Sequence, residues 1–130
     1  MITDSADATL RAWLRGVNEG RVDKVLALYT RDAVLLATFS PLAIRTPTAR
    51  RSYFEQLAKR RALQVMLHEQ TVHTQQLPAG LEVISGIYCF RFELDAEPFS
   101  FEARFSMVVN PAESRPLLHH HSSQIPRALS

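Results

Sequence analysis

The sequence contains a single cysteine, Cys89, so no disulfide can form within the chain. We therefore expect a reducing compartment, and the cytoplasm is the predicted location. No stretch approaches the roughly 20 consecutive apolar residues that cross a bilayer, which predicts that the chain has no membrane-spanning segment. The first residues, MITDSADATL, lack the basic start and apolar core of a signal peptide, so we expect no targeting segment.

An excess of charge of one sign is also missing. The 15 Lys and Arg residues and the 13 Asp and Glu residues give a formal net charge of +2 at pH 7. This is far from the bias of a dedicated nucleic-acid-binding domain, and we predict no nucleic-acid partner. One basic cluster lacks nearby surface aromatic residues for base stacking, so we interpret it as a solvated helix face. Its members are Arg50, Arg51, Lys59, Arg60 and Arg61.

The chain of 130 residues has no repeats and no low-complexity linker, which predicts one domain over residues 1–130. Apolar residues recur at helical spacing in three segments of its first half. The first helix begins after Asp4 or Ser5 as its cap and ends near residue 18. The second is shorter and covers about residues 22–29. The third begins with Thr46 as cap and Pro47 in its first turn, and ends near residue 62.

Strand-like patterns dominate the second half. A short apolar run at residues 33–39 predicts an early strand, and from residue 65 onward the residues alternate as they do in strands. We expect strands at residues 65–77, 87–94, 99–109 and 117–124. Three helices with one early strand, followed by a run of antiparallel strands, indicate an α+β fold.

The two strands between residues 87 and 109 have one apolar and one charged face, because successive strand side chains point to opposite sides. The apolar face holds Tyr88, Phe90, Phe92, Leu94, Phe99, Phe101, Ala103, Phe105, Met107 and Val109. The other face carries Arg91, Glu93, Glu102 and Arg104 at its centre. The alternation by itself favours an apolar face in the core and a charged face in water. The alternative is a sheet covered on both sides, whose charged row lines a pocket.

Four segments carry a resemblance to a known family. RRSYFEQLAKR, CFRFELD, EARFSMV and LLHHHSSQIP, in this order and spacing, resemble the association domain of calcium/calmodulin-dependent protein kinase II and its free-standing bacterial relatives. The whole layout, from about residue 18 to residue 123, is similar to the nuclear transport factor 2-like (NTF2-like) or cystatin-like cone. The resemblance implies a curved antiparallel sheet wrapped around three N-terminal helices, with a pocket between them. It implies no kinase activity, because the kinase region is missing.

The resemblance also implies roles for individual residues. It places Arg60, Arg91, Arg104, His119 and His121 in the pocket. Members of the family dimerise through the other side of the sheet. This predicts a homodimer interface formed by Tyr88, Phe90, Phe92, Phe101 and Phe105. This assignment is the reverse of the one that alternation alone favours. Val25 and Arg50 replace a tyrosine and a histidine of the family's pocket, so its ligand preference is not transferred.

Enclosed arginines need a partner, because a buried guanidinium keeps its proton and must be paired or bind an anion. Glu93 and Glu102 could balance the charges of Arg91 and Arg104. Arg60 would then give the pocket a net charge of +1. We hypothesise that the pocket binds a small carboxylate or similar anion through bidentate arginine contacts. The alternative is an internal Arg–Glu network without a ligand. No cofactor is predicted.

The histidines and the fold raise two further questions. His119 and His121 share a strand face and could bind zinc with a third ligand such as His73, His68 or a glutamate. No third ligand is fixed by spacing, so we predict no metal site.

The same fold hosts ketosteroid isomerases and SnoaL-like cyclases. Their aspartate base corresponds here to about Ala37, so that base is missing. The candidates for a general base in such an isomerase, cyclase or hydrolyase are therefore His119, His121 and Glu102. We interpret Cys89 as a small buried hydrophobic residue, not as a nucleophile.

Overall fold

The computed structural model describes residues 5–126. It contains the helices α1 (Ala6–Asn18), α2 (Val22–Leu26) and α3 (Pro47–Ala58), and the short 3-10 helices η1 (Glu69–Thr71) and η2 (Pro78–Gly80). The strands are β1 (Tyr29–Leu36), β2 (Arg61–Leu67), β3 (His73–Gln76), β4 (Glu82–Leu94), β5 (Glu97–Val109) and β6 (Leu117–Gln124). No helix within residues 5–126 is long and apolar enough to cross a membrane.

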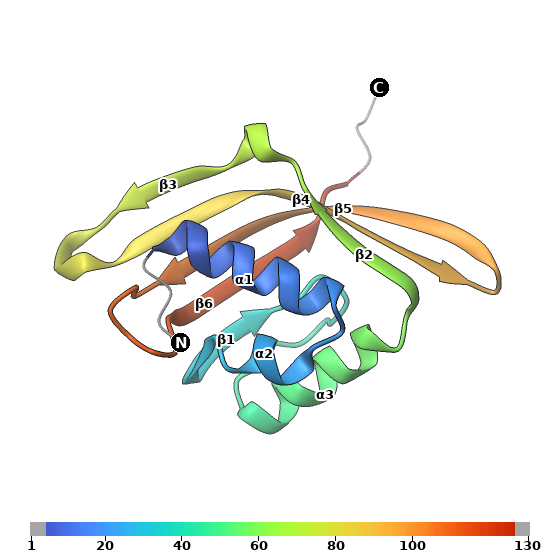
Figure 1. The fold of residues 1–130 in the computed structure, drawn as a ribbon, viewed down its shortest axis with the longest axis horizontal. Helices are drawn as coiled ribbons and strands as arrows, with labels where there is room; N and C mark the ends of the chain where they lie inside the picture. The colour runs from blue at the N-terminus through green and yellow to red at the C-terminus, as the bar shows by residue number, and fades with distance from the viewer. Residues whose placement is uncertain (1–4, 127–130) are drawn as a thin grey trace.

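Six strands form one curved sheet in the order β1-β6-β5-β4-β2, and β3 pairs with another stretch of β4. β1 runs parallel to β6, whereas the other pairs are antiparallel. The three helices lie together against one face of this sheet (Figure 1). The predicted α+β cone, a curved sheet around three N-terminal helices, is confirmed.

The first and third helices begin as predicted. The Ser5 side chain accepts a hydrogen bond from the backbone N–H of Ala8 at 3.0 Å, while Asp4, the alternative cap, lies outside the described residues. In α3 the Thr46 hydroxyl accepts from the N–H of Ala49 at 3.2 Å, and Pro47 occupies the first turn. α3 ends at Ala58, before the predicted end, because β2 already begins at Arg61.

The predicted strand at residues 65–77 is interrupted. Its two halves are β2 and β3, and η1 separates them. The β4–β5 hairpin is longer than predicted, with 13 residues in each strand. Its turn consists of Asp95 and Ala96, whose φ angles of 51° and 66° lie in the left-handed region that favours glycine.

The sheet faces the helices with its apolar side, so the orientation expected from the resemblance is wrong. Tyr88, Phe90 and Phe105 are 0%, 2% and 3% exposed, whereas Arg91 and Arg104 are exposed. Burying an aromatic side chain removes 150–250 Å² from water, worth several kcal/mol at ~25 cal/mol per Å². Burying an unpaired guanidinium costs free energy instead. The simple alternation therefore predicted the core correctly.

The same finding corrects the expected dimer interface. Tyr88, Phe90, Phe92 and Phe105 are interior residues of a single chain, so they are not available to a partner subunit. Phe101 is half-buried and packs at the margin of the core, where its ring lies 5.4 Å from that of Phe92.

Candidate functional site

A continuous row of polar side chains crosses the interior beneath α1. The indole Nε1 of Trp13 donates to the hydroxyl of Tyr29 at 3.1 Å, and that hydroxyl lies 2.7 Å from Nδ1 of His120. On the other side of the ring, Nε2 lies 3.1 Å from the hydroxyl of Tyr88, which donates to Oγ of Ser122 at 2.8 Å. Ser122 also contacts the hydroxyl of Thr38. We call these six residues the interior network.

The proton positions in the interior network follow from its donors. Trp13 can only donate, so the Tyr29 oxygen accepts and its own hydrogen is directed at Nδ1 of His120. The neutral ring then carries its hydrogen on Nε2 and donates it to the Tyr88 oxygen. Tyr88 passes its hydrogen to Ser122, so each hydroxyl between Trp13 and Ser122 both accepts and donates.

Burial keeps this network uncharged. It lowers the pKa of His120 to about 3, and the neighbouring His119 and His121 add smaller effects in the same direction. Burial also raises the pKa values of Tyr29 and Tyr88 well above the ordinary tyrosine value. Every buried side-chain nitrogen and oxygen within residues 5–126 has a hydrogen-bond partner. The interior network is therefore a neutral, fully satisfied polar core.

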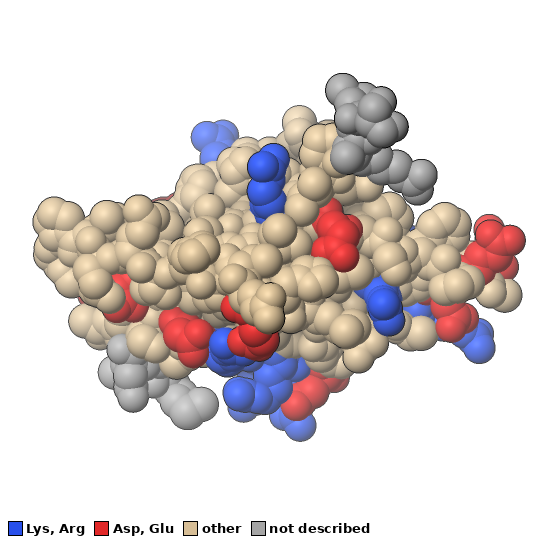
Figure 2. All heavy atoms as spheres, turned by 90° about the horizontal axis from the view of Figure 1, so that it is seen from above, with Lys and Arg blue, Asp and Glu red and all other residues tan. Residues whose placement is uncertain are grey.

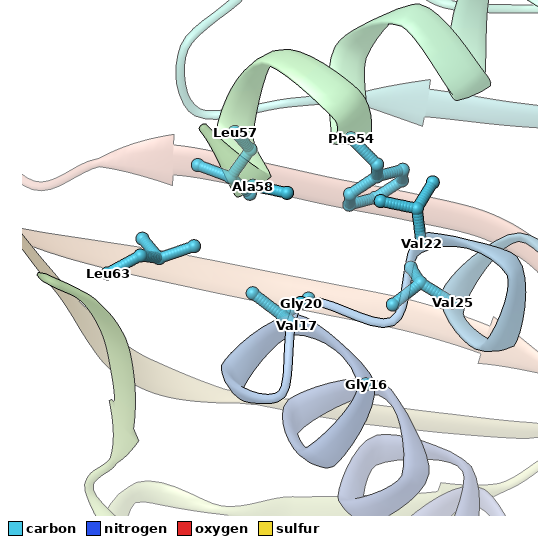
Figure 3. A pocket seen from close by; sticks show the side chains of 9 residues that line it. All are labelled: Gly16, Val17, Gly20, Val22, Val25, Phe54, Leu57, Ala58 and Leu63. Carbon is cyan, nitrogen blue, oxygen red and sulfur yellow. The ribbon is translucent and has the colours of Figure 1, made fainter. Parts of the chain in front are cut away.

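Side chains fill the space between the helices. The cleft among α1, α2 and α3 has a volume of about 10 Å³, which is at most the space of one water molecule, and its lining is apolar (Figure 3). The two helices α1 and α2 approach closely because Gly16 has no side chain. A Cβ atom there would lie 2.7 Å from Cγ2 of Val25. This cleft cannot hold a carboxylate ligand.

The residues expected in the pocket lie on the outer face or at the edge of the sheet. Arg91, Arg104, Glu102 and His121 are exposed, and His119 is half-buried. Cross-strand pairing places Arg104 opposite Ile87, four residues from Arg91, so the two arginines stand about 13 Å apart along the sheet. The structure does not bring them together as a fork for one small carboxylate.

The remaining predicted pocket residues have other partners. The guanidinium of Arg60 lies over the ring of Phe92, 5.1 Å from its centre. Glu93 pairs with Arg61 at 3.4 Å, and Glu102 lies 2.7 Å from Nε2 of His68. The alternative of an internal Arg–Glu network is thus replaced by separate contacts near the surface.

Two open grooves run along the outer face. The first, of about 450 Å³, is lined by Arg104, His121, Ile87 and a group of serines. The second, of about 1070 Å³, holds the His68–Glu102 contact beside Phe99 and Phe101. Across residues 5–126, no three His, Cys, Asp or Glu side chains are placed to hold a metal ion. Cys89 is buried, and its burial and the nearby Glu102 raise the pKa of its thiol.

Sequence reasoning missed a third groove, of about 650 Å³, between α2, the start of β1 and the first turn of α3. Four arginines line it: Arg31, Arg50, Arg51 and Arg115. Arg50 is only 3% exposed, although we interpreted it as part of a solvated face. The signal was present, because Arg50 stands at helical spacing before Phe54 and Leu57, which are also buried.

Comparisons with solved structures identify the fold. No protein-family model matches the chain, and no curated protein sequence matches it significantly. The structure is similar to a proposed calcium/calmodulin dependent protein kinase II association domain from Xanthomonas campestris, with a TM-score of 0.82, 23% identity and coverage of 94% of this chain and 86% of that one. It is also similar to an uncharacterised protein with a cystatin-like fold from Caulobacter vibrioides, with a TM-score of 0.78, 11% identity and coverage of 96% and 90%.

Enzyme-like proteins share the fold as well. A proposed dehydratase of the NTF2-like family from Streptomyces avermitilis gives a TM-score of 0.76 at 11% identity, over 92% of this chain and 94% of that one. These likenesses confirm the NTF2-like, cystatin-like fold that the sequence motifs predicted. At such identities they establish the fold alone.

Proposed function

We propose that the chain is a self-associating binding module that pairs with a second copy through the outer face of its sheet. The observation that carries this proposal is the composition of that face, opposite the helices (Figure 1). Half-buried aliphatic side chains from three strands lie on it among His119, His121 and several serines: Val34, Leu36, Val83, Ile87 and Val108. Interfaces of non-obligate complexes mix apolar and polar groups in this way.

The charges on the outer face are suited to a second copy. In a two-fold contact each residue i meets residue j of the partner, and j meets i. Arg104 and Glu102 are both exposed on β5, two residues apart, so each copy presents a cation and an anion to the other. The name of the Xanthomonas campestris structure, an association domain, is consistent with this function.

The proposal is tested by measuring the mass of the protein in solution, by light scattering at tens of micromolar. The wild-type chain is expected at twice its monomer mass of 14.7 kDa. Ile87→Asp places a carboxylate on the outer face of the sheet and should give the monomer, whereas Ser52→Asp on α3 should leave the dimer intact. A monomeric wild-type chain, or a dimer that persists in Ile87→Asp, would contradict the proposal.

A second candidate function, acid–base catalysis in the interior, is favoured by one observation. His120 has a tyrosine hydroxyl at each of its ring nitrogens, an arrangement that can relay a proton. Structures of similar fold include an epoxide hydrolase/cyclase-like enzyme and the proposed dehydratase. This candidate moves the catalytic histidine from His119 or His121, which lie outside the core, to His120.

The catalytic candidate is tested by assaying hydration, dehydration and epoxide-opening substrates. Any activity should be lost in His120→Gln and retained in His119→Gln and His121→Gln, which serve as matched controls on the same strand. Activity that survives His120→Gln would exclude the interior network as its source. A wild-type chain without activity on these substrate classes would leave self-association as the function.

A further inference from the structure

We propose that the groove between α2 and α3 binds a small dianionic ligand of the phosphomonoester class. This site, called the arginine groove, is defined by Arg31, Arg50, Arg51 and Arg115 and has a volume of about 650 Å³. Its volume falls within the range of small-molecule sites. The arginine groove lies at the β1 edge of the molecule, and the inference does not rest on self-association through the outer face.

The arginine groove has an excess of positive charge. Its lining contains four arginines and one carboxylate, Asp23, which leaves a local charge of +3. Asp23 is already engaged, because Arg51 contacts it at 3.0 Å. Among residues 5–126, Arg31, Arg50 and Arg115 have no carboxylate within ion-pair distance. Three guanidinium groups therefore form no direct ion pair within the described chain, although Asp32 is near enough to raise the pKa of Arg50.

Backbone carbonyls hold two of these guanidinium groups in place. Arg50 donates to the carbonyl oxygens of Ala33 at 2.9 Å, Arg31 at 2.8 Å and Thr30 at 3.1 Å. Arg115 donates through one terminal nitrogen to the carbonyls of Leu26 and Tyr29, at 3.2 and 3.4 Å. Because neutral carbonyls orient these groups, their charges are fixed in position but not neutralised. Such preorganised cations lose little conformational freedom when an anion binds.

The positive charge extends beyond the arginine groove. Burial lowers the pKa of Arg50, and Arg115 adds to this effect while Tyr29 and Asp32 oppose it, although the guanidinium remains protonated. A second groove on the other side of α2 shares Arg115 and adds Arg15, Arg21 and Lys24 against Glu19. Seven cationic side chains and two carboxylates line the two grooves, which gives them a net charge of +5. The whole chain has a net charge of only +2, so the rest of the molecule is negative.

The surface carries both grouped and single charges. Figure 2 shows several Lys and Arg side chains together at the lower margin with Asp and Glu among them, and other Lys and Arg side chains standing singly. Long-range attraction of an anion depends on such asymmetry more than on net charge.

The chemistry of the lining favours a phosphomonoester. Guanidinium groups bind phosphate oxygens in a bidentate manner, and a phosphomonoester offers about two negative charges and three terminal oxygens, which suits a surplus of three cations better than one carboxylate does. Pro47 and Thr48 also line the groove, so the positive end of the α3 dipole adds to the attraction. Leu26, Ala27 and Pro47 supply apolar contacts for an organic part of the ligand.

The test uses phenyl phosphate, inorganic phosphate and benzoate as probes in isothermal titration calorimetry with the full chain. Phenyl phosphate is expected to bind at least tenfold more tightly than benzoate. Arg31→Gln should weaken that binding about tenfold. It should do so without affecting folding, because Arg31 has no side-chain partner within residues 5–126. Arg31→Gln combined with Arg115→Gln should abolish binding.

A matched control removes equal charge elsewhere. Arg91→Gln combined with Arg104→Gln on the outer face should bind phenyl phosphate as the wild-type chain does. An equal loss of affinity in this control would show non-specific charge attraction and overturn the proposal. No heat with phenyl phosphate, or equal affinity for benzoate, would also overturn it. Tighter binding to single-stranded DNA than to phenyl phosphate, with a steep salt dependence, would replace the small ligand by a polyanion.

Discussion

The hydroxyl oxygen of Tyr29 lies 2.7 Å from Nδ1 of His120, which joins the first strand to the last strand inside the core. The two residues are 91 positions apart in the chain, and the parallel pairing of β1 with β6 brings their strands together. Because Nδ1 accepts from Tyr29 and Nε2 donates to Tyr88, these contacts match the neutral imidazole, and a proton on Nδ1 would require the Tyr29 hydroxyl to turn away. The histidine is therefore held neutral by geometry as well as by burial.

The neutral state of His120 predicts a specific pH dependence of stability. Its folded pKa of about 3 is below the unfolded value of ~6.5, so the unfolded chain binds a proton that the folded chain does not. The free energy of unfolding should be highest above pH 6.5 and fall as pH drops toward 3, by up to about 1.4 kcal/mol per pH unit from this group. Urea unfolding at several pH values, compared between the wild-type chain and His120→Gln, measures this contribution. The two slopes would coincide if His120 were protonated in the folded state.

Removing one hydroxyl from the interior network should cost more than its hydrogen bonds alone. Tyr88→Phe leaves Nε2 of His120 without a partner and the hydroxyl of Ser122 with Thr38 alone, and we expect a loss of about 1–3 kcal/mol in unfolding free energy. A double-mutant cycle with Ser122→Ala checks the mechanism, because the two effects should not add. Strict additivity would mean that the hydroxyl of Tyr88 acts independently of Ser122.

Two adjacent arginines on α3 should differ widely in their contribution to stability. Arg50→Ala leaves the three β1 carbonyls at Thr30, Arg31 and Ala33 without their donor, and we expect a loss of about 3 kcal/mol. Arg51→Ala removes exposed pairs with Asp23 and Glu55 and should cost less than about 1 kcal/mol. Chemical denaturation of both variants measures the difference. Equal losses would contradict the assignment of Arg50 to the core.

The hairpin turn between β4 and β5 offers a stabilising substitution. Ala96 has a φ of 66°, which glycine adopts without a steric cost, and a two-residue turn of this type favours Asp-Gly. Ala96→Gly should raise the unfolding free energy by up to about 1 kcal/mol and the Tm by about 4 °C. Ala112→Gly, at an exposed position without positive φ, is the control and should give no gain. A lower Tm for Ala96→Gly would be inconsistent with the turn geometry.

The sequence was sufficient for the fold and for the core, but not for the site. Helical spacing identified the buried stripe of α1, and strand alternation identified Tyr88, Phe90 and Phe105 as one face. The error came from assigning that face to an interface by resemblance, although the free energy of burying aromatic rings favours the core. Had the sheet been oriented correctly, the predicted catalytic histidine would have been His120, which lies on the interior face, and not His119 or His121.

Other features depend on contacts that a linear pattern does not contain. The parallel pairing of β1 and β6 joins segments distant in the chain, so the contact between Tyr29 and His120 could not be predicted from local spacing. The arginine groove likewise combines a strand, a helix and the loop before β6, since Arg31, Arg50 and Arg115 belong to different elements. Only the position of Arg50 on the buried stripe of α3 hinted at it.

The hydrogen bonds donated by Arg50 also limit where a strand from another chain can add to the sheet. β1 is an end strand, and its free backbone groups are taken up by Arg50 and by a two-way bridge between Leu35 and Ile44. A strand from another chain would have to displace these bonds before it could add there. At the opposite border β2 is blocked in the same way, because the side chain of Asn18 bonds both backbone groups of Val65. Strand exchange or fibril growth should therefore begin beside β3, whose four residues are all exposed.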